Sequence, residues 1–389
     1  MAYEIYLKKN EEKRIVAGHS WVYANEVARI DGKDKNGSLA TVYSHDGRYI
    51  GKGYINHASK ILVRIFIRDN SEDGKELYLR RIKEADDYRR KLGYDNCYRM
   101  VFAEADNLPA LIIDRYGDVL VMQCLSLGID LRKNMIVDCL NELFHPEGIY
   151  ERSDVAVRKK EGLAEYKGLL SGEVGDYCEI TENGLKMLVD VRNGQKTGYF
   201  LDQKENRFAV RKYCKGAEEV LDCFCNSGGF SLNAATVAKK VISLDISPLA
   251  LRNVEDNAKL NGIENITTLC GDVFDELRKF KAAKRQFDTV ILDPPAFCKT
   301  ADEVKDAYRG YKDINLTAMK IVKSGGFLIT CSCSHYMTMP LFEKMLIEAA
   351  RESGRTVRSV EVKTQAPDHP SLLCAEETQY LKFFVLQVI

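Results

Sequence analysis

The sequence predicts an α/β protein whose C-terminal half is Rossmann-like, with a parallel-rich sheet. Four apolar runs there each end in a carboxylate or a glycine-rich turn, and the chain between runs is long enough for a helix. Such runs are typical of buried parallel strands, whose carboxyl ends line one crevice. We therefore expect a nucleoside cofactor in that crevice. The runs are Val220–Cys223, Val241–Asp245, the segment ending at Cys270–Asp272, and Val290–Asp293.

The first run is followed by a turn that lets the backbone approach a ligand closely. Asn226-Ser227-Gly228-Gly229 supplies two glycines before a helix expected near Phe230. The turn lacks the G-x-G-x-x-G pattern of dinucleotide sites and the lysine of the triphosphate-binding G-x-x-x-x-G-K-[ST] pattern. A ligand with a ribose and no phosphate fits this turn better.

The next two runs end in carboxylates that suit the rest of such a ligand. Asp245 ends the second run, where it can accept hydrogen bonds from both ribose hydroxyls. Ser247-Pro248 predicts a helix start, with Ser247 as its cap. Asp272 follows the third run, where it can contact an adenine edge. A single glycine pair is usually only a turn, and a strand-terminal Asp is more often a helix cap, but four such signals in order favour an S-adenosylmethionine site.

The N-terminal residues predict a small β-barrel. Strand-like runs are separated by glycine-rich turns, and residues 60–67 alternate, with four branched aliphatic side chains on one face. Trp21, the only tryptophan, is expected in the core rather than as a stacking platform. Residues 1–68 contain twelve Lys and Arg against seven Asp and Glu, a net charge of +5 in a chain that is neutral overall, so they are the better candidate for holding RNA. The runs are Leu39–Tyr43, Tyr49–Tyr54 and Lys60–Ile67.

One amphipathic helix is predicted from Glu72 to Leu92, before Gly93. Apolar side chains recur at three- and four-residue intervals, and the basic side chains are interleaved with acidic ones, so we expect the basic ones on a solvated face. The apolar set is Tyr78, Ile82, Ala85, Tyr88 and Leu92, and the basic set is Arg80, Arg81, Lys83, Arg89, Arg90 and Lys91.

Residues 98–185 predict an α+β domain. Strand-like runs at Ala110–Asp114 and Val119–Leu125 precede a helix near Leu131–Phe144 and a further strand at Gly148–Arg152.

Eight motifs, taken in order, resemble those of the ribosomal large subunit methyltransferase I family. None is specific alone, but the combination is, and it spans almost the whole chain. The motifs are Gly18–Tyr23, Asn107–Tyr116, Lys196–Gln203, Asn226–Gly229, Asp293–Phe297, Arg309–Asn315, Ser332–Ser334 and Asp368–Pro370. The resemblance implies a PUA domain followed by a seven-stranded methyltransferase domain, which uses S-adenosylmethionine to form 5-methylcytosine in 23S ribosomal RNA.

The resemblance also suggests how the chain is divided. We expect a PUA-like RNA-binding barrel at 1–70, a helical connector at 71–97, a middle α+β domain at 98–185 and the methyltransferase domain at 186–389. Twelve scattered cysteines, no signal-like start and no bilayer-length apolar run predict a cytoplasmic protein with reduced thiols. The expected partner is large-subunit ribosomal RNA and not a membrane, and a homodimer is left open.

Methylating carbon 5 of cytosine requires a nucleophile, because that carbon reacts only after something has added at carbon 6. A thiolate suits this addition, and residues 327–334 form a strand-like run with Cys331 and Cys333 on the same face. The pattern alone does not choose between them. The family motif places its nucleophile between two serines, which here is Cys333, and Cys331 is expected to be an inert buried thiol.

Asp293 is the second predicted catalytic residue. At the strand end it can share a proton with ring nitrogen 3 of cytosine, or it only orients the cofactor. Phe297 is a candidate stacking partner for the base, and Cys298 is not expected to assist product release, because two residues separate it from the prolines. His335 and His369 are both candidates for the base that removes the carbon 5 proton, and neither is preferred.

The residues predicted to surround the cofactor follow the strand ends and the motif before the first strand. They are Asp202, Gln203, Phe224, Asn226, Ser227, Gly228, Asp245, Ile246, Ser247, Asp272, Val273, Asp293 and Pro294. No metal is predicted, because the C-x-C pairs at 223/225 and 331/333 lack the two-residue gap and nearby histidines of zinc sites.

Three other functions remain as alternatives. A methyltransferase of this fold can modify an exocyclic amine or guanine nitrogen 7 without a cysteine nucleophile. A non-catalytic RNA-binding assembly factor would keep the fold and lose the chemistry.

Overall fold

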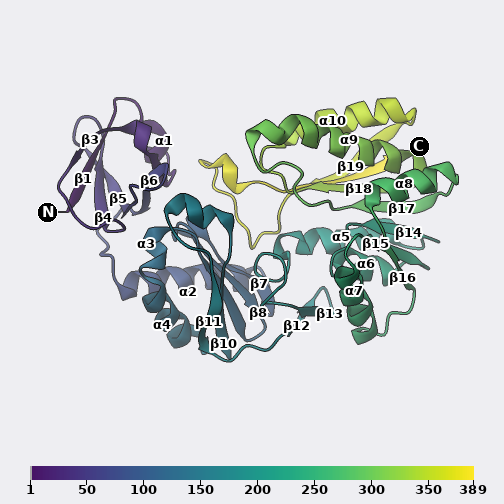
Figure 1. Cartoon of the computed structure of the whole chain (residues 1–389), viewed down its shortest axis with the longest axis horizontal. Helices are drawn as coiled ribbons and strands as arrows, with labels where there is room; N and C mark the ends of the chain where they lie inside the picture. Colours follow the sequence, from purple (N-terminus) through teal and green to yellow (C-terminus); the bar gives the residue numbers. More distant parts are fainter. Residues whose placement is uncertain (1) are drawn as a thin grey trace. The chain divides into compact units, whose positions relative to one another are not determined.

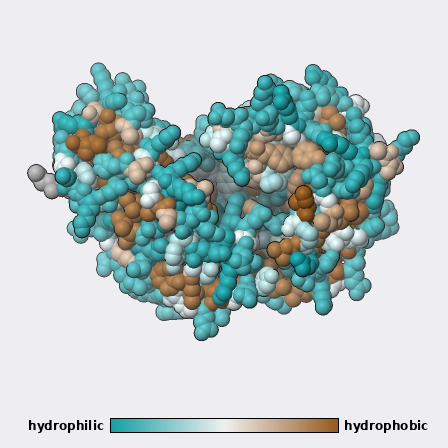
Figure 2. All heavy atoms as spheres, in the orientation of Figure 1, coloured by the Kyte–Doolittle hydropathy of each residue, from teal (hydrophilic) through white to brown (hydrophobic). Residues whose placement is uncertain are grey.

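The computed structural model describes residues 2–389, which form two compact units (Figure 1). The first unit contains the chain up to Ile180 together with Val189–Leu201 and Pro367–Thr378, and the second contains Thr181–Leu188, Asp202–Ala366 and Gln379–Ile389. Hydrophilic side chains cover most of the face drawn in Figure 2, and apolar ones lie in small separate groups. Within these residues, no helix combines the length and apolar character needed to cross a membrane.

The first unit begins with the predicted barrel. Its strands form one six-stranded sheet in the order β2-β6-β5-β4-β1-β3, in which β1 and β4 are parallel and the other pairs are antiparallel. The bounds are β1 Tyr3–Leu7, α1 Glu12–Val16, β2 Trp21–Tyr23, β3 Val27–Asp31, β4 Leu39–Tyr43, β5 Tyr49–Ile55 and β6 Ile61–Ile67. The three predicted strands are therefore confirmed.

Both faces of β6 are buried. Ile65 packs in the barrel core, whereas Phe66 on the opposite face packs against Tyr54 in a second core that continues into the middle of the chain. Trp21 is half-buried and lies outside both cores, with its indole N–H donating to Glu104 at 2.7 Å. The prediction that Trp21 is a core residue was wrong, because a polar partner holds the ring at the barrel edge.

A five-stranded sheet in the order β11-β10-β9-β8-β7 forms the middle of the chain. The helices α2 and α4 pack together, and their apolar side chains share a core with this sheet. The bounds are α2 Lys75–Lys91, β7 Cys97–Phe102, β8 Leu111–Tyr116, β9 Val119–Cys124, α3 Leu127–Asp130, α4 Lys133–Phe144, β10 Gly148–Ser153 and β11 Tyr166–Gly172, followed by the β12 Cys178–Glu182 and β13 Leu185–Val189 hairpin. The predicted connector helix and α+β pattern are present, while the exact domain boundaries stay a prediction.

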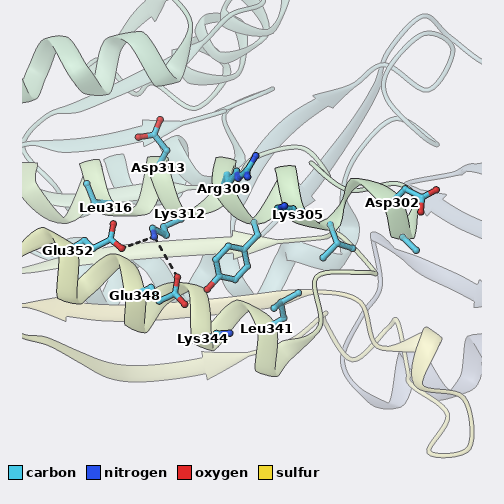
Figure 3. Close-up of a pocket in the computed structure, with 13 residues that line it drawn as sticks. Asp302, Lys305, Arg309, Lys312, Asp313, Leu316, Leu341, Lys344, Glu348 and Glu352 are labelled. Atoms are coloured by element: carbon cyan, nitrogen blue, oxygen red, sulfur yellow. Dashed lines mark hydrogen bonds and ion pairs between the residues drawn. The ribbon is translucent and has the colours of Figure 1, made fainter.

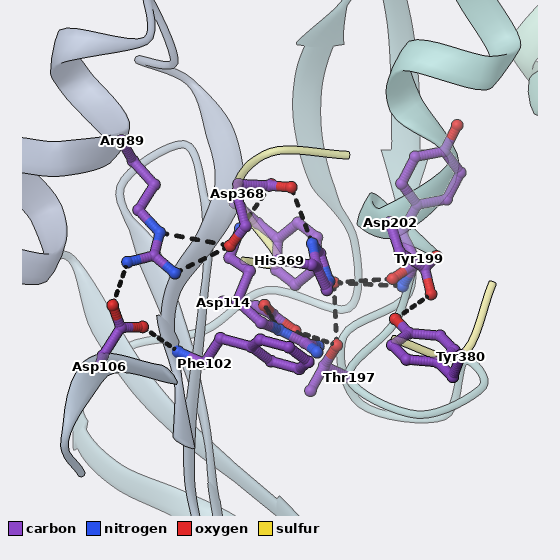
Figure 4. Close-up of polar contacts among 12 residues, drawn as sticks. Arg89, Phe102, Asp106, Asp114, Thr197, Tyr199, Asp202, Asp368, His369 and Tyr380 are labelled. Atoms are coloured by element: carbon purple, nitrogen blue, oxygen red, sulfur yellow. Dashed lines mark hydrogen bonds and ion pairs between the residues drawn. The ribbon is translucent and has the colours of Figure 1, made fainter. Parts of the chain in front are cut away.

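The structure corrects the predicted faces of α2. Arg89 is fully buried, where its guanidinium pairs with Asp106 at 2.6 Å and donates to the carbonyl oxygen of Asp368 at 2.9 Å (Figure 4). Arg81 is also buried and donates to the Asn107 carbonyl oxygen at 2.7 Å. Tyr88, assigned to the apolar face, is 38 % exposed. Both arginines can be buried because a carboxylate or carbonyl oxygens accept hydrogen bonds from their guanidinium groups.

The second unit contains the predicted seven-stranded sheet, in the order β16-β15-β14-β17-β18-β20-β19. The first five strands are parallel, and β20 is antiparallel to both of its neighbours. The bounds are α5 Lys204–Cys214, β14 Val220–Cys223, α6 Gly229–Ala235, β15 Val241–Asp245, α7 Pro248–Leu260, β16 Ile266–Cys270, α8 Val273–Ala282, β17 Phe287–Leu292, α9 Val304–Ile321, β18 Val322–Ser332, α10 Met339–Ser353, β19 Val357–Lys363 and β20 Lys382–Val388.

Helices cover both faces of this sheet (Figure 1). Side chains from α8, α9 and α10, among them Leu277, Tyr311 and Phe342, form the core on one face. Side chains from α5 and α6, among them Val210 and Phe230, form the core on the other face. Because both faces are covered, a ligand can reach the strands only at their ends, and the carboxyl ends of β14 to β18 meet at one edge.

Candidate active site

The turn after β14 has a constrained backbone. Phe224, Asn226 and Gly228 all have positive φ, at 62°, 48° and 86°, which only glycine adopts without strain. A Cβ on Gly228 would lie 3.1 Å from side-chain atoms of Leu232 and Val254, so the backbone there is closely packed. Two non-glycine residues held in strained conformations indicate that the shape of this turn is functional.

Asp245 ties that turn to the next strand. Its carboxylate accepts the Asn226 N–H at 3.0 Å and the Ser247 N–H at 2.9 Å, and it stays partly exposed at the end of β15. Ser247 caps α7 by accepting the Ala250 N–H at 3.3 Å, which confirms the predicted cap. Next to it, Ile246 leaves 67 % of its surface exposed and can cover an apolar ring.

Asp272 and Val273 begin α8. The Asp272 carboxylate caps the helix by accepting the Asp275 N–H at 3.2 Å, and it is exposed. Val273 is buried in the core. Asp272 is therefore a helix cap, the common role of an Asp at a strand end. Its predicted contact with adenine stays a prediction.

Asp222, inside β14, was missed by the sequence analysis. It is fully buried, and one carboxylate oxygen accepts the Ser231 hydroxyl at 2.6 Å, while the other has no hydrogen-bond partner among residues 2–389. Burial, with contributions from the negative charges of Asp293 and Asp245, raises the pKa of Asp222 to about 7. An acid within an apolar strand is the signal that could have identified it.

Asp293 follows β17 at the same edge of the sheet. Its carboxylate accepts the Gln203 amide N–H at 2.9 Å and bonds to the Cys331 thiol. Burial, with a contribution from the charge of Asp202, raises the pKa of Asp293 to about 7. Asp202 in turn accepts the Tyr380 hydroxyl at 2.6 Å (Figure 4), so the two predicted residues before α5 both lie in this cluster of carboxyls.

The predicted nucleophile lies just beyond β18. Leu292 of β17 pairs with Thr330 of β18, so the chain that follows these strands brings Asp293 and Cys331 together. Cys333 comes two residues later and is partly exposed, whereas Cys331 is fully buried, as expected for an inert thiol.

The two serines beside Cys333 are held by one buried tyrosine. The Ser332 hydroxyl donates to the Tyr311 hydroxyl at 3.1 Å, and Tyr311 and Ser334 share a hydrogen bond at 2.9 Å. The Cys298 N–H also donates to the Ser334 hydroxyl, at 3.3 Å. Tyr311, from the Arg309–Asn315 motif, therefore fixes the turn that carries the thiol, a role that no local pattern predicts.

Other candidates have different surroundings. The Cys298 thiol is buried and bonds to the Thr300 carbonyl oxygen at 3.0 Å, which fits a structural thiol. Phe297 packs against Tyr311 with ring centroids 4.6 Å apart, so part of its ring surface is already covered. His335 is exposed, whereas His369, in the first unit, is buried against Asp368 at 2.7 Å (Figure 4).

Two other polar clusters are already held by ion pairs within the described residues. A groove of about 760 Å³ lies between α9 and α10 (Figure 3), and its Lys312 is already paired with Glu348 and Glu352. Cys124, Asp130 and Glu151 lie close enough together to hold a cation, but Lys133 pairs with both carboxylates and Arg158 with Asp130.

These groups fit S-adenosylmethionine. The cofactor carries a positive sulfonium and an ammonium, which can compensate the unpartnered buried oxygen of Asp222. Asp245 is partly exposed and could accept hydrogen bonds from ribose hydroxyls, and the exposed side chain of Ile246 could cover an apolar ring. The tight turn at Gly228 would let a ligand approach the backbone closely. Ser227 and the buried Pro294 complete the predicted set at the ends of β14 and β17.

Comparison with known proteins agrees with this description. Residues 5–68 match the PUA-like domain model and residues 158–384 match the S-adenosylmethionine-dependent methyltransferase model. Ribosomal RNA large subunit methyltransferase I of Aeromonas salmonicida is 41 % identical over 396 residues, and that of Vibrio vulnificus is 41 % identical over 399 residues, with all of both chains covered in each case.

Solved structures show the same fold. A candidate SAM-dependent methyltransferase from Streptococcus mutans superposes over the full length of both chains with a TM-score of 0.84 at 20 % identity. SMU.776, solved as a complex with SAH, superposes equally completely with a TM-score of 0.85 at 19 % identity. The cofactor of this chain is S-adenosylmethionine, and the chain belongs to the ribosomal RNA large subunit methyltransferase I family.

Proposed function

We propose that the protein forms 5-methylcytosine in large-subunit ribosomal RNA, with Cys333 as the nucleophile. Its relatives are named for methylating this class of RNA. The observation that carries the proposal is a partly exposed thiol just beyond β18, beside the strand whose end carries Asp293. Both lie at the edge of the sheet that carries the residues predicted for the cofactor.

The proposed reaction balances without any further reactant. The Cys333 thiolate donates its electron pair to carbon 6 of cytosine, and Asp293 supplies a proton to ring nitrogen 3, so carbon 5 becomes nucleophilic. The cofactor supplies a methyl group on a sulfonium. Carbon 5 takes the methyl group and breaks its bond to the sulfonium, which leaves the cofactor as a neutral thioether. Ring nitrogen 3 returns its proton to Asp293 and a base removes the carbon 5 proton. The electrons of that C–H bond restore the ring double bond as the bond between carbon 6 and the cysteine sulfur breaks, which releases the thiolate.

Methylation mapping tests this proposal. Ribosomal RNA from cells with and without the gene should differ at one cytosine, whose carbon 5 mark is lost with the gene. Loss of a mark on an exocyclic amine or on guanine nitrogen 7 would instead support the alternative chemistries. If the methylation map is unchanged and calorimetry detects no binding of S-adenosylmethionine, the protein is a non-catalytic RNA-binding factor.

Cofactor affinity should depend on pH through Asp222. Because the pKa of this carboxyl is about 7, it is mostly protonated at about pH 6 and mostly ionised at about pH 8. The ionised form attracts the cationic cofactor, so we expect the dissociation constant of S-adenosylmethionine to rise about tenfold from pH 8 to pH 6. Calorimetry at several pH values measures this.

The Asp222→Asn variant is the control for that titration. It should bind the cofactor more weakly at pH 8, and its affinity should change less with pH than that of the original protein. S-adenosylhomocysteine, which lacks the sulfonium charge, should show a shallower pH dependence with the unchanged protein. Equal slopes for the original and the variant would rule out Asp222 as the titrating group.

The barrel presents a row of side chains that suits RNA. Tyr6 of β1 pairs in register with Arg29 of β3 and with Tyr43 of β4, and Tyr43 pairs with Tyr49 of β5. The Tyr6 and Tyr43 rings are stacked at 5.1 Å, and the Arg29 guanidinium lies 4.1 Å from the centre of the Tyr6 ring. Tyr49 is exposed, and Tyr6 and Tyr43 are partly exposed. Accessible aromatic rings beside an arginine are typical of platforms on which unpaired bases stack.

Replacing Tyr43 by Ala should weaken RNA binding. Base stacking contributes about 1–3 kcal/mol per base, so we expect the affinity for a labelled single-stranded oligoribonucleotide to fall about 5- to 150-fold in fluorescence anisotropy. Tyr43→Phe keeps the ring and should bind as the original does. Tyr177→Ala, which removes a tyrosine that is 51 % exposed outside this row, is the second control. Equal affinity of Tyr43→Ala and Tyr177→Ala would contradict the assignment.

A further inference from the structure

Lys382 is a buried lysine next to the Ser332–Ser334 turn. It is the first residue of β20, opposite Ser332 in the antiparallel pair with β18, and only 4 % of its surface is exposed. Its ammonium donates to the carbonyl oxygen of Ser334 and to that of Tyr380, both at 2.7 Å. The hydrogen bond to Ser334 fixes the charge beside the residue that follows Cys333.

No carboxylate among residues 2–389 pairs with the positive charge of Lys382. Burying an ammonium without a counter-charge is costly. Burial lowers the pKa of Lys382 to about 8, and a negative charge on Cys333 acts in the opposite direction. A thiolate at Cys333 would therefore compensate the buried ammonium.

The two thiols of this strand end therefore have opposite surroundings. Cys331 is fully buried beside the Asp293 carboxyl, and both burial and that negative charge raise the pKa of its thiol well above the ordinary value. Cys333 is partly exposed and has an ammonium as its neighbour. A positive neighbour favours a thiolate, and a negative one opposes it.

We propose that Lys382 is a positioning residue that holds Cys333 as a thiolate, an inference that rests on the proposed function. Its two hydrogen bonds to carbonyl oxygens keep the ammonium in place while the sulfur gives its electron pair to carbon 6. The lysine stays protonated throughout and transfers nothing. When the bond between sulfur and carbon 6 breaks, the same charge stabilises the departing thiolate.

Alkylation of the thiols tests this directly, without RNA or cofactor. The full-length protein and its Lys382→Gln variant are treated with iodoacetamide at a series of pH values, and each cysteine is quantified by peptide mass spectrometry. Gln keeps a donor for the carbonyl oxygens and removes the charge. Loss of the neighbouring positive charge disfavours the thiolate, so alkylation of Cys333 at neutral pH should slow about tenfold in the variant. Lys382→Arg keeps the positive charge, so its Cys333 should be alkylated much faster than the Cys333 of Lys382→Gln.

The other cysteines act as controls in the same digest. Cys270 is exposed and Cys374 partly exposed, and both should react at unchanged rates in every variant. Cys223, which is buried, should stay unmodified as long as the variant is folded. If Cys223 becomes modified in Lys382→Gln, that variant has unfolded, and Lys382→Met is used as the neutral variant instead. An apolar side chain is well tolerated in place of a buried charge.

The outcome separates this inference from the proposed reaction. If Cys333 of the folded neutral variants is alkylated at the original rate across the pH series, Lys382 does not stabilise the thiolate, and the inference is wrong whatever the enzyme makes. If alkylation of Cys333 slows tenfold in the neutral variants while methylation mapping finds no carbon 5 mark, the inference about Lys382 is supported and the proposed function is wrong.

Discussion

Replacing Cys333 by Ala should abolish methyl transfer. Carbon 5 of cytosine has no other route to becoming nucleophilic once the thiolate is lost, so we expect turnover to fall about 1,000-fold or more. The change should leave the fold intact, because Cys333 is partly exposed and contributes no side chain to the apolar cores. Transfer of labelled methyl groups from S-adenosylmethionine to ribosomal RNA measures the effect.

A covalent trap distinguishes Cys333 from its neighbour. RNA containing 5-fluorocytosine cannot lose a proton from carbon 5, so the adduct with the enzyme persists and can be seen on a denaturing gel. The original protein and Cys331→Ala should both form this adduct, whereas Cys333→Ala should not. If Cys333→Ala still methylates RNA at the original rate, the enzyme acts on an exocyclic amine or on guanine nitrogen 7.

Local patterns predicted much of the second unit. The strands at Val220–Cys223 and Val241–Asp245 have the predicted bounds, and Ser247 caps its helix as expected. These features depend on short-range properties, namely a buried apolar run, a strand-terminal carboxylate and a capping hydroxyl before a proline. The sequence therefore indicates where the strands end, and with them the place of the cofactor residues.

Residues whose role depends on distant neighbours could not be predicted in this way. Arg89 lies on a helix that looks amphipathic, but Asp106 and the Asp368 carbonyl draw it into the interior. Lys382 looks like an ordinary charge at a strand end until the pairing of β18 with β20 places it beside Ser334. Such positions are set by contacts between segments far apart in the chain, which no local pattern contains.

The choice between the two thiols shows the same limit. Alternation along a strand placed both on one face, and only the family motif favoured Cys333. In the structure β18 ends at Ser332, and the chain then turns, held by Tyr311 and Lys382. The difference in exposure between the two thiols follows from this turn and not from the strand.

Replacing Asp293 by Asn should lower turnover and alter its pH dependence. A carboxylic acid with a pKa of about 7 can give a proton to ring nitrogen 3 at neutral pH, which an ordinary Asp cannot. Loss of such a proton donor costs about 100- to 10,000-fold in rate. Because the acid form is the active one, kcat/KM of the original enzyme should fall as the pH rises above about 7.

The Asp293→Asn variant should not show the decline of kcat/KM at alkaline pH, since an amide does not titrate. Its kcat/KM should only rise with pH, as the cysteine thiolate forms. Asp288→Asn is the matched control, because Asp288 lies on the same strand and pairs with Lys323 at 2.9 Å near the surface. If Asp293→Asn lowers the rate but keeps the decline above neutral pH, another group carries the proton, and Asp293 acts only by orienting the cofactor. The shape of the pH profile, more than the size of the loss, therefore identifies the role of this carboxyl.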